Sequence, residues 1–234
     1  MLLEVCCENL ESVSIASRCG ADRIELCSSL ETGGLTPTHD LVKLAIEQSA
    51  CPLMILIRPR AGNFLYTPLE KLQILHEIET YLKLNIEGVV IGALTERNQL
   101  DLDFIKEINS MCADVSVTFH RAFDFVEDPY QALNELISLG INRVLTSGQC
   151  RSAVDGKQLI RNLIEEAAGQ ISIMPGAGIN SRNISELIDY VQPREIHLSA
   201  KKRIINTMDS DPFNTDYYTT DDQELGRIIK IINN

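Results

Sequence analysis

The chain has 234 residues, of which 44% are hydrophobic and 23% are charged, proportions typical of a folded globular protein rather than a disordered one. Lysine and arginine total 21 against 33 aspartates and glutamates, so the formal net charge is -12 at pH 7. Because so acidic a surface repels nucleic-acid phosphates and anionic lipids, we expect no nucleic-acid partner.

The sequence also argues against a membrane or secreted protein. No stretch reaches the roughly 20 apolar residues of a membrane helix, and the N-terminus lacks the basic region of a signal peptide. The seven cysteines are odd in number and lack the spacing of a secreted disulfide framework. We therefore expect a cytoplasmic protein with reduced thiols and no membrane partner.

Short β-rich segments alternate with helical periodicity along the whole chain. The eight predicted strands are residues 2–8, 23–28, 52–60, 88–94, 115–123, 143–147, 171–174 and 195–199. Helix starts are marked between them, for example where Thr67 can cap a helix that begins with Pro68. Such alternation implies parallel strands, and eight repeats predict an α/β fold of the closed (β/α)8 TIM barrel type.

A doubly wound open sheet is the competing fold. That fold normally has a glycine fingerprint at its first turn, where this chain has Cys6-Cys7-Glu8-Asn9. No linker or composition break divides the chain, so we predict a single domain over residues 1–234 with its barrel core at 2–200. An atypical tail covers 201–234, in which a polar, turn-rich segment precedes a last helix at 223–232.

Polar side chains recur near the carboxyl ends of the predicted strands, on the side that should face the barrel interior. They are Glu4, Cys6, Glu25, Cys27, Arg58, Arg60, Thr118, His120, His197 and Ser199. Active sites of TIM barrels lie at this end, so five strands converging there favour a site. The structural alternative is an ion-pair network among the glutamates and arginines.

The thiols of Cys6 and Cys27 share this inward face on neighbouring predicted strands. Such strands lie about 4.8 Å apart, roughly the span of two metal–sulfur bonds of about 2.3 Å. Two buried free thiols are the alternative. Cys150, in a loop after the sixth strand, is positioned to supply a third sulfur.

A glycine-rich turn follows the seventh predicted strand. Gly176 and Gly178 flank one alanine, and Ser199 ends the eighth strand. Many TIM barrels bind phosphate on backbone amides in this region, although a plain tight turn explains the glycines nearly as well.

Several blocks of the sequence together resemble the CutC family, which is linked to copper homeostasis. They are EVCC (4–7), ADRIELC (21–27), GGLTP (33–37), IRPRAGNFLY (57–66), TFHRAFD (118–124), RVLTSG (143–148), GAGI (176–179) and EIHLSA (195–200). The resemblance implies a cytosolic TIM barrel, binding of copper as Cu(I) by Cys6 and Cys27, and a homo-oligomer. After Ala200 the sequence departs from the family pattern.

Two functions therefore compete. The first is a copper homeostasis protein that binds Cu(I) through cysteine thiolates at the carboxyl end of the barrel. The second is an enzyme acting on a small anionic or phosphorylated substrate, with Glu25, Arg58 and His120 as its catalytic residues. The sequence does not decide whether a reaction is catalysed, and a scaffold that works through its surface is a third reading.

Overall fold

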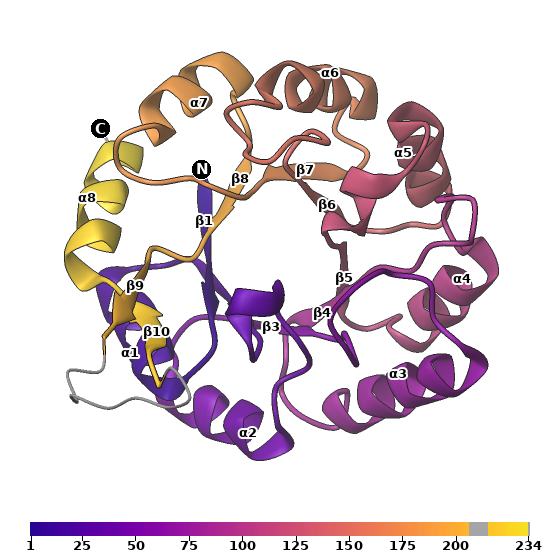
Figure 1. The fold of residues 1–234 in the computed structure, drawn as a ribbon, viewed down its shortest axis with the longest axis horizontal. Helices are drawn as coiled ribbons and strands as arrows, with labels where there is room; N and C mark the ends of the chain where they lie inside the picture. Colours follow the sequence, from indigo (N-terminus) through magenta and orange to yellow (C-terminus); the bar gives the residue numbers. More distant parts are fainter. Residues whose placement is uncertain (206–214, 234) are drawn as a thin grey trace.

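The computed structural model describes residues 1–205 and 215–233. Eight parallel strands form a nearly closed barrel with helices around it, which confirms the predicted TIM barrel (Figure 1). The strands are β1 (Leu2–Cys7), β2 (Arg23–Leu26), β3 (Leu53–Leu56), β4 (Gly88–Ile91), β5 (Ser116–Phe119), β6 (Arg143–Thr146), β7 (Ser172–Pro175) and β8 (Glu195–Leu198).

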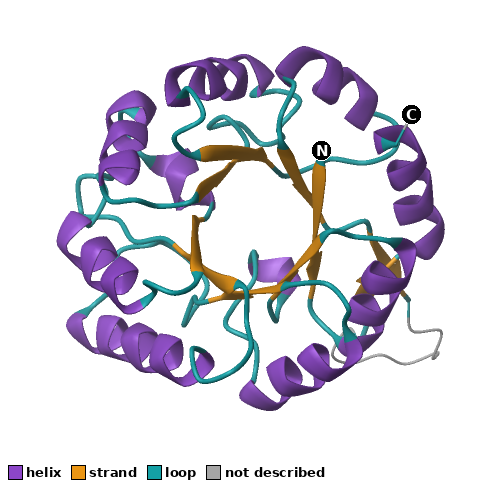
Figure 2. Cartoon of the chain, turned by 180° about the vertical axis from the view of Figure 1, so that it is seen from behind, coloured by secondary structure: helices purple, strands orange, loops and turns teal. Residues whose placement is uncertain are grey.

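Hydrogen bonds join neighbouring strands in the order β7-β6-β5-β4-β3-β2-β1-β8. β1 therefore lies between β2 and β8, and β7 lies beside β8 to complete the ring (Figure 2). Outward-facing side chains such as Leu3, Val5 and Ile24 are buried in the main hydrophobic core under the helices. This alternation leaves the polar side chains of β1, β2 and β8 facing the barrel interior.

The main helices follow the strands as expected from the sequence. They are α1 (Leu10–Cys19), α2 (His39–Gln48), α3 (Pro68–Tyr81), α4 (Leu102–Met111), α5 (Pro129–Ser138), α6 (Lys157–Ala167), α7 (Ile184–Val191) and α8 (Asp222–Ile232), with 3-10 turns η1 (Leu30–Thr32) and η2 (Arg121–Phe125). Thr67 and Glu70 form a reciprocal capping box at the start of α3.

Several strands are shorter than predicted at their carboxyl ends. The third was expected over 52–60, yet β3 ends at Leu56 and the chain continues as a loop to α3. The fifth was expected over 115–123, yet β5 ends at Phe119 and His120 caps the turn η2. The carboxyl-terminal opening of the barrel is thus built largely from loops. In these loops the alternation of a strand no longer determines which way each side chain points.

The region after β8 differs from the turn-rich segment predicted for it. β9 (Lys201–Ile204) and β10 (Tyr217–Thr220) pair antiparallel, and residues 206–214 of the predicted tail lie outside the described residues. The predicted last helix is confirmed as α8, which packs beside α1 and α7 with Leu225 and Ile228 buried. Among the described residues, none of the helices combines the length and apolarity that crossing a membrane requires.

Candidate functional site

Ion pairs fill the amino-terminal end of the barrel interior. Arg23, at the start of β2, bonds to Glu4 on β1 and to Glu195 at the start of β8. Arg143, at the start of β6, donates from Nε to the same Glu195 oxygen at 3.1 Å and from Nη1 to Thr118 Oγ1 at 3.3 Å. Each of these buried charges has a partner of opposite sign, which is what burial of charge requires.

His197 joins this network to the opposite end of the barrel. Its Nδ1 lies 2.8 Å from Glu4 Oε1. Burial by itself would raise the pKa of Glu4, but His197 and Arg23 together lower it to about 2. Burial would lower the pKa of His197, whereas Glu25 and Glu4 raise it above its usual value. Because Glu4 holds Nδ1, Nε2 is the ring nitrogen that remains for another partner.

Two thiols and a carboxyl group lie next along the interior. The sulfurs of Cys6 and Cys27 are 3.6 Å apart, and Cys6 Sγ lies 3.4 Å from Glu25 Oε1. The other Glu25 oxygen, Oε2, is buried and has no hydrogen-bond partner in the described part of the chain. The hydrogen bond to Cys27 and burial raise the pKa of the Cys6 thiol, and burial raises the pKa of Glu25. Both shifts are toward the neutral form of the group.

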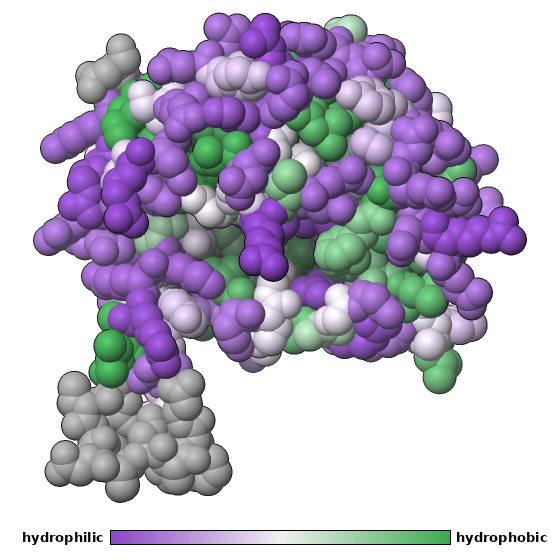
Figure 3. All heavy atoms as spheres, turned by 45° about the horizontal axis from the view of Figure 1, so that its top comes forward, coloured by the Kyte–Doolittle hydropathy of each residue, from purple (hydrophilic) through white to green (hydrophobic). Residues whose placement is uncertain are grey.

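A cavity of about 630 Å³ opens above these groups at the carboxyl ends of the strands, and Figure 3 shows this face of the molecule hollowed. Cys6, Glu25 and His197 line it, whereas Cys27 does not and is fully buried beneath it. The wall combines positive, negative and apolar side chains, which include Arg58, Arg121, Arg182, Lys201, Asp221, Glu224, Leu30, Leu56 and Phe64. A cavity of this size suits a small organic molecule as well as an ion.

His120 faces the cavity from the end of β5. Its Nδ1 accepts a hydrogen bond from the amide of Ala122 at 3.1 Å, while Nε2 is buried with no hydrogen-bond partner in the described residues. Burial and nearby Arg58 lower the pKa of His120 to about 3, so the ring is neutral and carries its proton on Nε2. A side chain at Gly92 would lie 2.3 Å from the ring, so the ring requires glycine there.

Arg58 lies in the loop after β3 and is held by main-chain carbonyls rather than by a carboxylate. Its guanidinium donates to Thr32 O at 3.1 Å, to Gly34 O at 2.9 Å and to Gly62 O at 2.9 Å. Its Nε is buried without a hydrogen-bond partner among the described residues. Burial lowers the pKa of Arg58, and its positive charge has no neutralising carboxylate in direct contact in the described chain.

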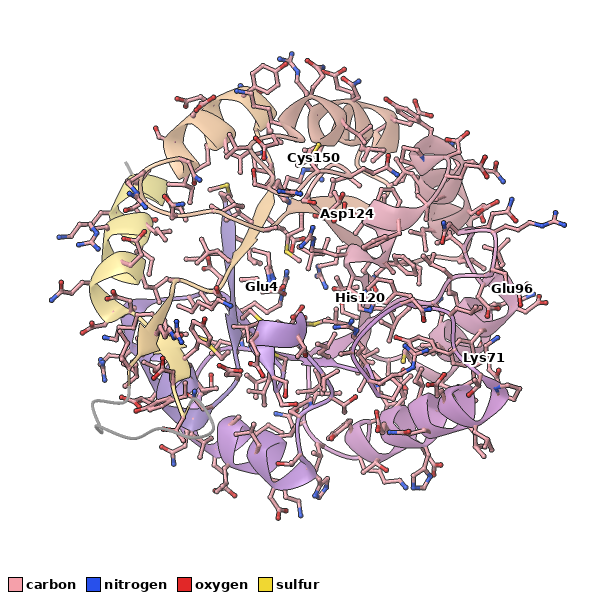
Figure 4. The ribbon with its side chains drawn as sticks, viewed as in Figure 1. Glu4, Lys71, Glu96, His120, Asp124 and Cys150 are labelled. Atoms are coloured by element: carbon pink, nitrogen blue, oxygen red, sulfur yellow. The ribbon has the colours of Figure 1, made fainter. Side chains whose placement is uncertain are left out.

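The structure therefore brings Cys6, Cys27, Glu25, His120 and Arg58 to one end of the barrel. Figure 4 shows Glu4 inside the ring of strands, His120 across the interior from it and Cys150 on the α6 side.

The other predicted site residues lie in different surroundings. Gly178 and Ser199 line the cavity wall, while the amide of Gly176 is used in a 3.0 Å hydrogen bond to Thr146 O. Cys150 is exposed. Arg60 does not face the interior as predicted: it lies in the loop beyond the end of β3, and its side chain bonds to Glu70 of α3. The ion-pair network weighed as an alternative exists, but its arginines are Arg23 and Arg143 rather than Arg58 and Arg60.

Sequence reasoning missed two groups of residues. Arg23, Arg143 and Glu195 could have been found, because they stand at strand starts with the same inward alternation as the predicted residues. Asp124 had no such signal. Its carboxylate accepts from the amide and hydroxyl of Ser147 and from Thr146 Oγ1, and it pairs with Arg121, which ties η2 to β6.

The CutC family profile matches residues 1–202. A CutC protein of Pasteurella multocida is 46% identical over 201 residues, which cover 86% of this chain and 82% of that protein. The human copper homeostasis protein cutC homolog is 43% identical over 200 residues, or 86% of this chain and 73% of the relative. The crystal structure of a CutC protein from Streptococcus agalactiae superposes with a TM-score of 0.81 and 29% identity, covering 85% of this chain and 98% of that one.

Proposed function

Because the chain belongs to the CutC family, we propose that it serves copper homeostasis by binding Cu(I) as cargo through the thiolates of Cys6 and Cys27. The observation that carries this proposal is the 3.6 Å separation of the two sulfurs. They lie in an apolar cluster with Met54, Leu56 and Val90. Soft thiolate ligands select Cu(I), and an apolar surrounding limits access of water to the bound ion.

Binding requires the two sulfurs to move apart and to lose their protons. Two metal–sulfur bonds in a line span about 4.6 Å, so a linear arrangement would need an increase of about 1 Å over the observed separation. Metal binding displaces thiol protons, and the raised pKa of Cys6 makes the affinity fall as pH falls. All seven cysteines are free, which fits the reducing cytoplasm that we propose as the location.

A competition titration of the reduced protein with Cu(I) and a chelator tests this proposal. We expect one equivalent of Cu(I) in the wild type and an affinity at least 100-fold lower in Cys6→Ser and Cys27→Ser. Cys150→Ser is the matched control at an exposed thiol and should bind as the wild type does. A double Cys6→Ser, Cys27→Ser variant that retains wild-type affinity would exclude the cysteine pair.

A second candidate is an enzyme acting on a small anionic or phosphorylated substrate. It is favoured by Nε2 of His120 and Nε of Arg58, which have no hydrogen-bond partner within residues 1–205 and 215–233 and lie beside a cavity much larger than a metal ion. We propose that these two groups donate hydrogen bonds to substrate oxygens and that Glu25 transfers a proton. Gly178 and Ser199 would contact the anionic group, with Gly176 positioning the turn.

A crystal soaked in phosphate tests this second candidate. An ion bound beside Gly178 and Ser199 is the expected result, and a clear electron-density map without one would contradict it. The resemblance to the family also supports a homo-oligomer, which light scattering of the purified protein would test.

A further inference from the structure

We infer that Cys6, Glu25 and His197 form a binding site for a divalent transition metal such as Zn²⁺, with an open coordination position facing the cavity. A sulfur, a carboxylate oxygen and an imidazole nitrogen from these three residues all lie within 4.8 Å of one another. The site shares Cys6 with the proposed Cu(I) pair but does not need Cys27, so each can exist without the other.

The separations fit a tetrahedral ion. Bonds of about 2.0 to 2.3 Å place neighbouring ligand atoms of a zinc site roughly 3.3 to 3.8 Å apart. Cys6 Sγ and Glu25 Oε1 are already 3.4 Å apart. The remaining pairs, at no more than 4.8 Å, need an adjustment of about 1.5 Å or less to reach this range.

The mixture of donor atoms favours a divalent ion over Cu(I). Zn²⁺ accepts sulfur, nitrogen and oxygen ligands together, whereas Cu(I) prefers sulfur. When the metal binds, the Cys6 thiol releases its proton to solvent, and any proton held by Glu25 leaves with it. The thiolate and the Glu25 carboxylate then supply two negative charges that balance the ion, and the imidazole is neutral when it coordinates.

The surroundings of the three ligands are those of a metal site. Glu4 holds His197 at Nδ1, at 2.8 Å, and is itself held by Arg23, an arrangement that orients a ligating imidazole. Glu25 is 5% exposed, and its Oε2 has no hydrogen-bond partner in the described part of the chain. A buried carboxylate oxygen without a partner is costly, and a metal bound at this carboxylate would offset that cost.

The position of the ligands defines the kind of site. Cys6, Glu25 and His197 all line the cavity, from which Cys27 is absent. Structural zinc sites have four protein ligands, whereas catalytic ones have three and leave a position for water or substrate. Three ligands on the floor of a cavity of about 630 Å³ match the second type, and His120 and Arg58 in the same wall could contact a small molecule there.

Co²⁺ added to the reduced, metal-free protein tests the inference, because a cobalt–thiolate bond gives a charge-transfer band. We expect one equivalent of Co²⁺ to produce this band in the wild type and Zn²⁺ to remove it by displacement. The band should persist in Cys27→Ser and disappear in Cys6→Ser. In Glu25→Gln and His197→Gln the Co²⁺ affinity should fall at least 100-fold.

Parallel Cu(I) titrations separate this site from the cysteine pair. Cys27→Ser should lose Cu(I) and keep Co²⁺, whereas Glu25→Gln should keep Cu(I) and lose Co²⁺. Circular dichroism identifies any variant that fails to fold. If His197→Gln is unfolded, the Co²⁺ affinity of the isosteric Glu25→Gln tests the site on its own. Absence of Co²⁺ binding in the wild type, or unchanged Co²⁺ binding in Glu25→Gln, would overturn the inference whatever the result with Cu(I).

Discussion

The amino-terminal and carboxyl-terminal halves of the barrel interior carry similar side chains, but these side chains serve different roles. At the amino-terminal end, Glu4, Arg23, Glu195 and Arg143 contact one another and form a complete network. At the carboxyl end, Glu25, His120 and Arg58 each keep a buried polar atom without a hydrogen-bond partner in the described residues. Complete pairing is what stability requires of buried charge, whereas unpaired atoms beside a cavity indicate a ligand.

Glu4 and Glu25 show this contrast on adjacent strands. Both are buried, yet the pKa of Glu4 is lowered to about 2 while that of Glu25 is raised. The difference follows from their partners, since Arg23 and His197 bond directly to Glu4, whereas in the described residues the weak thiol donor of Cys6 is the sole hydrogen-bond partner of Glu25. Burial alone therefore does not distinguish a structural carboxylate from one available to a ligand.

Replacing Arg23 with methionine should produce the largest effect of any change that we predict. Glu4 and Glu195 would lose the guanidinium that both contact, and removal of one partner of a buried ion pair costs about 3–5 kcal/mol. We expect urea denaturation to show this loss. Arg161→Met, which removes an exposed pair with Glu165 on α6, is the control and should cost less than about 1 kcal/mol. Equal losses of stability in the two variants would show that the buried network stabilises the fold no more than an exposed ion pair does.

The pH dependence of stability tests the buried environment of His120 at the cavity. The unfolded chain takes up a proton near pH 6.5, whereas the folded protein keeps His120 neutral down to about pH 3. The unfolded state therefore binds more protons in this window, and stability falls as pH falls. Between pH 7 and pH 5, His120→Gln should lose about 2 kcal/mol less stability than the wild type.

The exposed His76 on α3 provides the control for this measurement. His76→Gln replaces an exposed rather than a buried histidine and so shows how much of any change comes from the substitution itself. If His120→Gln also follows the wild type, then His120 takes up its proton in the same pH range in the folded and unfolded states, and the lowered pKa assigned to this buried ring is wrong.

The fold and the inward direction of Glu4, Cys6, Glu25 and Cys27 could be predicted because strand alternation is a local property of the sequence. The depth was wrong for Glu4 and Thr118, which were expected near the carboxyl ends and lie in the amino-terminal network instead. The observed contacts of Cys6 with Cys27 and Glu25 confirm that these side chains share the interior. Alternation no longer applies where a strand ends. β3 stops at Leu56, and the alternation that predicted an inward direction for both arginines is right for Arg58, which lines the cavity, and wrong for Arg60, which pairs with Glu70.

The sequence also could not predict which buried charged residues pair with one another across the barrel. Arg143 and Glu195 are 52 residues apart and meet only because β6 and β8 face the same interior. Strand alternation identifies the residues that point inward, but choosing among inward-facing partners requires coordinates. The distinction between a paired Glu4 and a partly unpaired Glu25 is therefore a result of the three-dimensional structure.

Glu25→Gln should have the smallest effect on stability and gives the sharpest comparison. In the metal-free protein this change preserves the shape of a carboxyl group whose Oε2 has no hydrogen-bond partner in the part of the chain that the structure describes, so we expect a change in stability within about 1 kcal/mol of zero or a small gain. Glu4→Gln is the matched change one strand away and should cost several kcal/mol, because it weakens contacts with Arg23 and His197. Urea denaturation in the presence of a metal chelator measures both. A large loss in Glu25→Gln would place Glu25 with the structural network and remove the main physical reason for treating the carboxyl end as a ligand site.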